Sequence, residues 1–298
     1  MSKDSYAALG ASATKSGLHE ELAKSGVTHS GLFAPVLPDT AGDPEYSSFI
    51  HCDGAGTKSI VAYLLYRETG NLDVFSGLAE DATVMNLDDI YCIGQPESMF
   101  LANAIARNAH LVPDEAVGAL IRGYRTLVDS LEKHGVLIAL SGGETADCGD
   151  VVRTLLVDAV VGGRIKNSNI INADSIVPGD AIVGFASTGT TTYDNRENSG
   201  IGSNGLTLAR HCLLSSTHAE KYPEVLSPEI PAEAAYRGPF MVTDVPDGLG
   251  MSVGEALLSP TRSYSPVLAK LFKDLPSGIH GWIHTTGGAR GEGLRVGN

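Results

Sequence analysis

The chain has 298 residues, of which 43% are hydrophobic and 19% are charged, a composition that supports a buried core and excludes wholesale disorder. Its 21 basic and 35 acidic residues give a formal net charge of −14 without any block of like charges, which disfavours a nucleic-acid partner. The opening MSKDSYAALGASATKSG lacks a signal or transit pattern and no run of about 18 apolar residues follows, so we expect a cytoplasmic protein without a membrane partner.

The first predicted elements are a strand, a loop and a helix. The strand covers 45–52 and breaks into a glycine turn that begins at Asp53. The helix covers 59–69, because its apolar residues fall on one face and Gly70 follows as a C-terminal stop. A second helix is expected from about 74 to 91, and a strand of small apolar residues from 99 to 106.

The clearest helix pattern begins at Pro113-Asp114-Glu115, with acidic residues in its first turn, and ends at Gly135. Strands over 136–140 and 151–161 are then expected on either side of a loop, SGGETADCGD. This alternation of strands and helices predicts an α/β domain. The helix should bury one stripe of residues, namely Val117, Leu120, Ile121, Tyr124, Leu127, Val128 and Leu131.

A second domain is predicted after a boundary at about 163–178, which divides the chain into 1–165 and 166–298. Its expected elements are a strand over 181–186, a polar loop over 187–205, a helix over 206–214, a helix around 265–272 and a strand over 279–284. Four cysteines, Cys52, Cys92, Cys148 and Cys212, are too widely spaced for a zinc or redox motif, and we expect buried reduced thiols.

The glycine turn Asp53-Gly54-Ala55-Gly56-Thr57-Lys58 has the residues of a phosphate-binding loop. Glycines allow close backbone approach to a polyphosphate, the following helix start offers free N–H groups, Lys58 can neutralise phosphate charge, and Asp53 can hold Mg²⁺. The order differs from that of the P-loop. A structural glycine turn capped by an aspartate explains the pattern equally well.

Three acidic residues, Asp81, Asp88 and Asp89, lie in a largely apolar helical stretch. Asp81 and Asp88 share one face of this helix, and Asp89 lies about 100° around from Asp88. Carboxylates on such a helix are costly to desolvate, and a hard cation is the simplest compensation. An exposed acidic face is the alternative.

Two further glycine-bearing regions predict ligand contacts. In Ser141-Gly142-Gly143-Glu144, the glycines suggest close backbone approach and Glu144 a metal or substrate contact, although a plain turn remains open. The segments 202–205 and 285–288 resemble anion-receiving nests.

Together, seven motifs match one family in order and spacing over about residues 5–289. The chain resembles the aminoimidazole ribonucleotide synthetase family, the phosphoribosylformylglycinamidine cyclo-ligases. The motifs are DGAGTK (53–58), the acidic helix end (88–94), GGETA (142–146), PGD (178–180), SNG (203–205), LSPTRSY (258–264) and HTTGG (284–288).

The resemblance implies a two-domain α/β (α+β) enzyme whose N-terminal domains pair into a β-barrel across a homodimer. The family converts formylglycinamidine ribonucleotide and ATP to aminoimidazole ribonucleotide, ADP and phosphate. The resemblance also implies the cofactors ATP and Mg²⁺. It further implies an N-terminal domain for ATP binding and dimerisation, followed by a C-terminal substrate domain.

The resemblance assigns roles to the residues that match its motifs. Asp53 and Lys58 are the implied catalytic residues. The implied metal ligands are Asp53, Asp81, Asp89 and Glu144. The implied ATP-binding residues are Gly54, Gly56, Thr57, Lys58, Asn103, Gly142 and Gly143, and the implied substrate-binding residues are Ser203, Asn204, Gly205, Gly287 and Gly288.

Two features depart from the family pattern. Most members have a histidine directly before SNG, where this chain has Gly202 after an inserted polar stretch, 190–201. The family also continues well beyond TGG, whereas this chain ends ARGEGLRVGN, so we expect a C-terminal domain that is truncated relative to the family.

The family assignment leaves other functions open. Sister activities of the superfamily are selenophosphate synthesis, thiamine phosphate phosphorylation and the carbamoyl-dehydrating step of hydrogenase maturation. No cysteine precedes Cys52 and none ends the chain, which disfavours the first and the last of these. A nucleotide-binding homologue that has lost catalysis is a further alternative.

Overall fold

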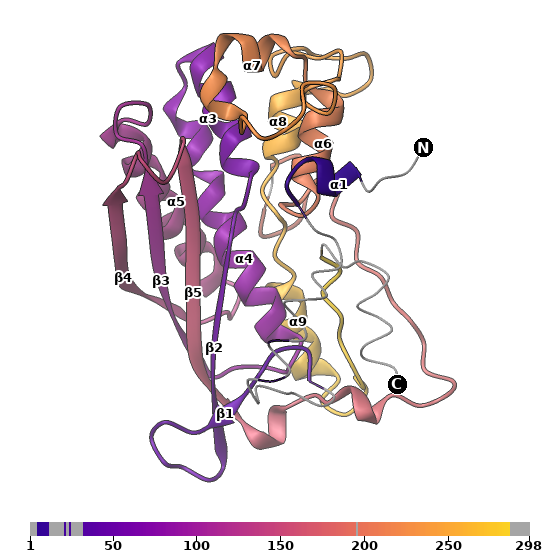
Figure 1. The fold of residues 1–298 in the computed structure, drawn as a ribbon. Coiled ribbons are helices and arrows are strands. Elements are labelled where there is room, and N and C mark those ends of the chain that lie inside the picture. The colour runs from indigo at the N-terminus through magenta and orange to yellow at the C-terminus, as the bar shows by residue number, and fades with distance from the viewer. Residues whose placement is uncertain (1–4, 12–20, 22–23, 25–31, 195, 287–298) are drawn as a thin grey trace.

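A five-stranded sheet organises the first half of the chain in the computed structural model, which describes residues 5–11, 21, 24, 32–194 and 196–286 (Figure 1). Its strand order is β1-β2-β5-β3-β4. The strands are β1 (Leu37–Pro38), β2 (Tyr46–Gly54), β3 (Ser98–Arg107), β4 (Ile138–Asp147) and β5 (Leu155–Lys166).

The direction of the strands places the ends of three of them at one edge of the sheet. β5 is antiparallel to both β2 and β3, and β4 is parallel to β3, so β2, β3 and β4 run the same way. The loops that follow these three strands therefore leave the sheet at the same edge. One row across the sheet joins Asp53, Ala159, Asn103 and Gly143, and the next joins Gly54, Asp158, Ala104 and Glu144.

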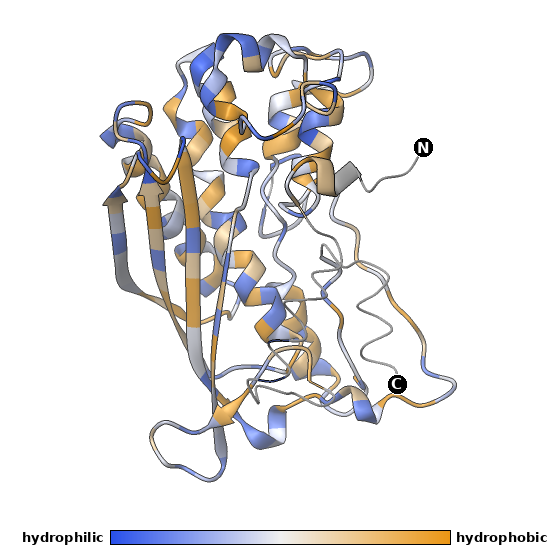
Figure 2. Ribbon diagram, viewed as in Figure 1, coloured by the Kyte–Doolittle hydropathy of each residue, from blue (hydrophilic) through white to orange (hydrophobic). Residues whose placement is uncertain are grey.

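Three helices cover one face of this sheet (Figure 1). They are α3 (Lys58–Thr69), α4 (Gly77–Tyr91), which follows the short 3-10 helix η1 (Leu72–Phe75), and α5 (Asp114–Glu132). The predicted stop at Gly70 is confirmed, since Gly70 caps α3 with a φ of 73°. β5, at the centre of the sheet, is mostly orange in Figure 2 because it is rich in apolar residues.

The elements predicted for the first half are largely confirmed, with two corrections. Ile121 is 55% exposed, so it lies outside the buried stripe of α5. The segment SGGETAD belongs to β4 and is not a loop, because after a bulge near Leu101 its residues continue to pair with β3. Glycines have low strand propensity, which concealed this pairing in the sequence.

The other face of the sheet has no helix over it among the described residues (Figure 1). Large apolar side chains are exposed there: Ile50 is 56% exposed, Phe100 47% and Leu156 39%. We call these three residues and their neighbours the open face. The ring of Phe100 lies over Gly162, where a Cβ would come within 2.4 Å of it.

The second half of the chain is helical and irregular. Its helices are α6 (Leu206–Leu213), α7 (Thr217–Lys221), α8 (Val253–Leu258) and α9 (Ser265–Asp274), and its 3-10 helices are η2 (Asn167–Asn169), η3 (Ala173–Ser175) and η4 (Pro223–Val225). The helices predicted near 206–214 and 265–272 are confirmed. The short helix α1 (Ser5–Ala8) lies near α6.

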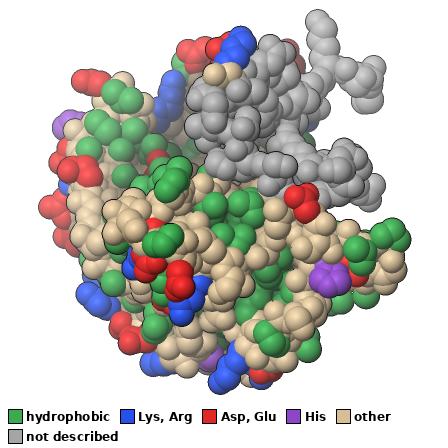
Figure 3. Space-filling view, turned by 90° about the horizontal axis from the view of Figure 1, so that it is seen from below, with side chains coloured by type: hydrophobic (Ala, Val, Ile, Leu, Met, Phe, Trp, Pro, Cys, Tyr) green, Lys and Arg blue, Asp and Glu red, His purple; other side chains and the backbone are tan. Residues whose placement is uncertain are grey.

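The strands predicted over 181–186 and 279–284 are wrong, because neither segment pairs with a strand in the described structure. Their apolar residues lack cover as a result: Ile182 is 101% exposed, Val183 70% and Ile283 41%. Figure 3 shows apolar side chains open to solvent on the lower face of the molecule. An apolar run predicts a strand only when a partner strand is available, which the sequence pattern does not reveal.

Two further expectations can be compared with the described residues. The four cysteines are free thiols, but only Cys92 is buried, and Cys52 and Cys212 are exposed. In the part of the chain that is described, no helix combines the length and the apolar character needed to cross a membrane.

Candidate functional site

The segment from Asp53 to Lys58, which we call the Asp53–Lys58 loop, runs from the last two residues of β2 to the first residue of α3, at the edge where β2, β3 and β4 end. Its shape requires glycine at two positions. A Cβ on Gly54 would lie 1.8 Å from Asp158 Oδ1, and Gly56 has a φ of 55°, in the left-handed region. Asp53 lies exposed in this loop, and its Oδ1 accepts a hydrogen bond from the Gly54 N–H at 2.7 Å.

Lys58 begins α3 and is fully buried. Its Nζ donates to Asp81 Oδ1 at 2.9 Å and to the Ser259 carbonyl oxygen at 2.5 Å. A buried ammonium without a counter-charge costs several kcal/mol, on the order of 3–5, so Asp81 is needed to keep Lys58 inside. A contact between Lys58 and a phosphate would require the ammonium to share or exchange this carboxylate.

Asp81, on α4, is also fully buried, and its two carboxylate oxygens differ. Oδ1 accepts hydrogen bonds from Ser203 Oγ at 2.9 Å, Thr261 N at 2.8 Å and Thr261 Oγ1 at 2.7 Å, in addition to Lys58. Oδ2 is buried and has no hydrogen-bond partner among the described residues. One oxygen therefore binds three segments of the protein, and the other retains its capacity for a donor or a cation.

Asp88 binds residues of the LSPTRSY motif, and Asp89 binds the histidine that begins the HTTGG motif. Asp88 is buried and accepts from Ser263 Oγ at 2.9 Å and from Tyr264 N at 3.0 Å, and burial raises its pKa to about 6. Asp89 is bracketed by His284 Nδ1 at 2.7 Å and His51 Nε2 at 3.3 Å. Burial acts to raise the pKa of Asp89, but the hydrogen bonds from the two histidines outweigh it and the pKa is lowered.

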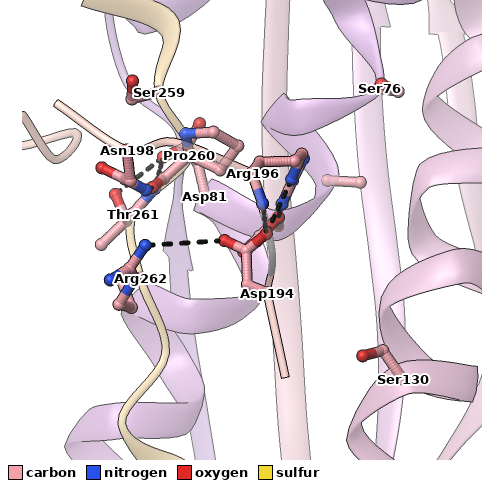
Figure 4. A network of polar contacts seen from close by, with 12 residues as sticks. Ser76, Asp81, Ser130, Asp194, Arg196, Asn198, Ser259, Pro260, Thr261 and Arg262 are labelled. Carbon is pink, nitrogen blue, oxygen red and sulfur yellow. Dashed lines mark hydrogen bonds and ion pairs between the residues drawn. The ribbon is translucent and has the colours of Figure 1, made fainter. Parts of the chain in front are cut away.

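One ion pair, between Arg196 and Glu80, anchors the inserted polar stretch on α4, and Asp194 lies between Arg196 and Arg262 (Figure 4). Arg196 Nη2 lies 2.6 Å from Glu80 Oε2, and its Nε lies 3.0 Å from Asp194 Oδ1. Arg262, 3.9 Å from Asp194 Oδ2, donates to backbone carbonyls at 188 and 189. Burial raises the pKa of Glu80 to about 7, although Arg196 opposes the shift.

Protein groups thus compensate the acids of α4, namely Glu80, Asp81, Asp88 and Asp89. The sequence pattern indicated a bound cation or an exposed acidic face, and it did not indicate this arrangement. Each of these acids binds residues of the second half, as Lys58 binds Ser259, so the α4 acids join the two halves of the chain. In the described part of the chain, no three His, Cys, Asp or Glu side chains form a group that could hold a metal ion.

Asp53 and Glu144, the other implied metal ligands, lie apart in the sheet. Asp53 on β2 and Glu144 on β4 are separated by β5 and β3, which at about 4.8 Å per strand corresponds to roughly 14 Å. They belong to adjacent rows, so their side chains leave opposite faces. Glu144 is exposed, and its side chain forms no hydrogen bond or ion pair with the described residues.

Asn103 and the two glycines of β4 fit together closely. A Cβ on Gly143 would lie 2.4 Å from Asn103 Oδ1, and Gly142 has a φ of 116°, so glycine is required at both positions. Asn103 is half-buried in the same row as Asp53. The implied ATP-binding residues of β3 and β4 therefore lie at the same end of the sheet as the Asp53–Lys58 loop.

The SNG loop reaches the same region from the second half. Ser203 binds Asp81, Asn204 Nδ2 lies 3.3 Å from Met85 Sδ on α4, and Gly205 has a φ of 78° before α6. One turn on, Thr207 Oγ1 lies 3.0 Å from Thr57 Oγ1. The structure thus brings the implied phosphate loop and the implied substrate loop together. Gly287 and Gly288 lie outside the described residues.

Sequence reasoning missed several residues that build this site. Thr261, Ser263 and His284 bind the α4 acids, yet none of these three residues was assigned a role. The helix α8 was also missed, although Ser252 and Glu255 form a capping box at its start, a pattern visible in the sequence.

Comparison with known proteins shows what the chain is similar to. Residues 36–165, which contain the sheet and helices α3 to α5, match the family model "AIR synthase related protein, N-terminal domain". Over these residues the chain is similar to that family. This finding bears out the resemblance that the seven motifs indicated.

Two curated relatives carry the name phosphoribosylformylglycinamidine cyclo-ligase. The protein of Methanothermobacter thermautotrophicus is 29% identical over 91% of this chain and 64% of its own length. That of Thermococcus gammatolerans is 30% identical over 79% of this chain and 55% of its own length. The chain therefore spans somewhat more than half the length of these relatives.

Among solved structures, thiamine monophosphate kinase from Aquifex aeolicus overlaps 56% of this chain and 48% of its own. The sequence identity is 12% and the TM-score 0.38. That likeness is too low to carry an argument about fold or function.

Proposed function

We propose that the protein takes part in the ATP-dependent cyclisation of formylglycinamidine ribonucleotide to aminoimidazole ribonucleotide. The observation that carries the proposal is the meeting of three family motifs at one place. The Asp53–Lys58 loop, the SNG loop and the LSPTRSY segment all contact the Lys58–Asp81 pair. The names of the two curated relatives support the same activity.

In this proposal the phosphates of ATP bind at the Asp53–Lys58 loop. Gly54 and Gly56 allow the backbone to approach the phosphates, and the N–H groups at the start of α3 donate to them. Phosphoryl transfer requires mainly positioning and charge neutralisation, which Lys58 supplies once its ammonium is shared with a phosphate. Asn103, Gly142 and Gly143 extend the ATP site along the sheet edge.

Mg²⁺ commonly uses one or two protein carboxylates together with phosphate oxygens and water, and it bridges and neutralises phosphate charge. Of the four implied ligands, Asp53 and Glu144 are exposed and have no ion pair among the described residues, whereas Asp81 and Asp89 are already engaged. We therefore place Asp53 first among the candidate ligands. Asp81 contributes only its unpartnered Oδ2, and Asp89 stays a weaker candidate.

The substrate is proposed to bind where the second half meets α4. Ser203, Asn204 and Gly205 lie beside the phosphate loop, which suits transfer of a phosphoryl group to a substrate held there. Gly287 and Gly288 are proposed as further contacts on the basis of the family resemblance.

We also propose a homodimer that pairs through the open face. Ile50, Phe100 and Leu156 expose apolar surface on a sheet that has helices on one face only. Monomeric proteins seldom leave such surface exposed, and pairing across a two-fold axis would bury it twice.

The test is to incubate the purified chain with formylglycinamidine ribonucleotide, ATP and Mg²⁺, and to measure ADP and aminoimidazole ribonucleotide. We expect both products from the wild type, a large loss with Asp53→Asn, and no change with Asp129→Asn, an exposed acid on α5. ATP binding without either product would identify a non-catalytic homologue. Full turnover by Asp53→Asn would remove Asp53 from the mechanism.

A further inference from the structure

A cavity of about 250 Å³ lies beside the phosphate loop, with Thr57 in its wall. It is bounded by Thr57 at the start of α3, Thr207 and Arg210 on α6, Arg153 before β5, and Glu224 on η4. Residues 9–11 of the N-terminal segment complete its wall. None of these residues other than Thr57 has a role in the proposed cyclo-ligase site.

Arg210 is a buried cation in this wall. It is 3% exposed, and its Nε is buried without a hydrogen-bond partner among the described residues. Its Nη1 donates to neutral acceptors, the Tyr236 hydroxyl and the Val225 carbonyl oxygen. A guanidinium is always charged, and burying it without a counter-ion is costly. Arg210 therefore creates a demand for negative charge.

The carboxylate in the same wall does not meet this demand. Glu224 Oε1 forms its ion pair with Arg67 Nη1 at 3.2 Å and also accepts from the Tyr63 hydroxyl. Among the described residues, the partners of the Arg210 guanidinium are the Val225 carbonyl oxygen, the Tyr236 hydroxyl and the face of the Tyr236 ring, and none of them is a carboxylate. The neighbouring His211 adds no charge near neutral pH, because burial and Arg210 lower its pKa to about 4.

Much of the remaining wall is apolar, with Ile60, Val225 and Ile230 among its residues, and further donors come from Arg153 and two threonines. Arg153 is exposed at its rim, with Nη1 3.2 Å from the Leu226 carbonyl oxygen. Thr57 and Thr207 share one hydrogen bond between their hydroxyls at 3.0 Å, which leaves the second hydroxyl hydrogen for a ligand. The starts of both α3 and α6 face this region, and helix N-termini favour anions.

The size and chemistry select the class of ligand. Pockets for whole drug-sized molecules occupy about 300–1,000 Å³, so this cavity suits a phosphate group with part of its carrier. Two arginines and hydroxyl donors match the oxygens of a phosphate monoester, which Arg recognises through charge-assisted hydrogen bonds.

We propose that this cavity, between Thr57, Arg153, Thr207 and Arg210, binds the terminal phosphate group of a small molecule. The group is either the monoester of a sugar phosphate or the last phosphate of a nucleoside triphosphate. Because the site is defined by binding, the proposal does not depend on cyclo-ligase turnover.

The test is isothermal titration calorimetry of the full chain with inorganic phosphate, ribose 5-phosphate and ribose. We expect saturable binding of the two phosphates and none of ribose. Arg153→Gln and Arg210→Gln should each weaken the binding of ribose 5-phosphate by about tenfold or more, because each variant loses a charged hydrogen bond to the phosphate. Arg125→Gln, an exposed arginine of α5 with the same change of charge, should stay within about twofold of the wild type.

Titration with the ATP analogue AMP-PNP distinguishes the two carriers. Competition with ribose 5-phosphate, together with weaker AMP-PNP binding by Arg153→Gln, assigns the phosphate to a nucleotide. Simultaneous binding of both assigns it to a sugar phosphate.

Thr207→Val keeps the test decisive if Arg210→Gln fails to fold, because it removes a hydroxyl without changing the side-chain volume. The proposal is overturned if neither phosphate binds saturably to the wild type. It is also overturned if Arg153→Gln and Thr207→Val both bind ribose 5-phosphate as tightly as Arg125→Gln does.

Discussion

Replacing Asp81 by asparagine tests whether the Lys58–Asp81 pair holds the two halves of the chain together. Both side chains are 0% exposed, so the substitution leaves the Lys58 ammonium buried beside a neutral amide. The new NH₂ group also introduces donors into a buried place. Removing one partner of a buried ion pair costs about 3–5 kcal/mol, a large part of the 5–15 kcal/mol of a typical domain.

Urea denaturation followed by the fluorescence of the single tryptophan, Trp282, measures this loss. With a slope near 3 kcal/mol per molar urea, we expect the midpoint to fall by about 1–1.7 M. Asp129→Asn, at an exposed position on α5, is the control and should change the free energy of unfolding by less than about 0.5 kcal/mol.

The double variant Lys58→Met/Asp81→Leu separates the charge from the packing, since it removes both ions and should be more stable than Asp81→Asn. A loss below about 1 kcal/mol in Asp81→Asn, similar to that of the control, would refute the reasoning.

Three further predictions concern single positions. Gly54→Ala should destabilise the fold by about 1–3 kcal/mol, because its Cβ would meet a carboxylate oxygen at 1.8 Å, whereas Gly184→Ala, with nothing within 4 Å, should be nearly neutral in the same denaturation assay. Burial raises the pKa of Asp88 from 3.8 to about 6. The wild type should therefore be most stable relative to Asp88→Asn below about pH 4, and this difference in the free energy of unfolding should fall by about 3 kcal/mol as the pH rises to about 7. Urea titrations of both proteins at each pH measure the difference. Ile50→Asp should give a monomer in sedimentation experiments, and Ile121→Asp, at nearly equal exposure but on α5, should leave the proposed dimer intact.

The sequence predicted those elements whose determinants are local. The helix α5 follows from apolar spacing and from Gly135, and α3 from its stripe and Gly70, because these features act within a few residues. β4 was truncated and two strands of the second half were wrong, since strand formation depends on a partner that may be distant in sequence.

The sequence predicted which residues form the candidate site better than it predicted how these residues contact one another. The sequence identified Lys58, Asp81 and Ser203 as important, but not that they bind one another. Ser203 lies 122 residues from Asp81 and Thr261 lies 180 residues from it, and no local periodicity reports a contact over such distances. The compensation of buried acids by hydroxyls and backbone N–H groups was therefore attributed to a cation.

The long separation between Asp81 and its partners has a consequence for synthesis on the ribosome. Lys58 precedes Asp81 by 23 residues and is available as soon as α4 emerges. Thr261 follows by 180 residues, which at about 5–20 residues per second corresponds to roughly 10–35 s of translation. During that interval α4 presents its acids and part of its apolar surface without the second half, so the nascent chain passes through a period in which it depends on chaperones more than the finished protein does.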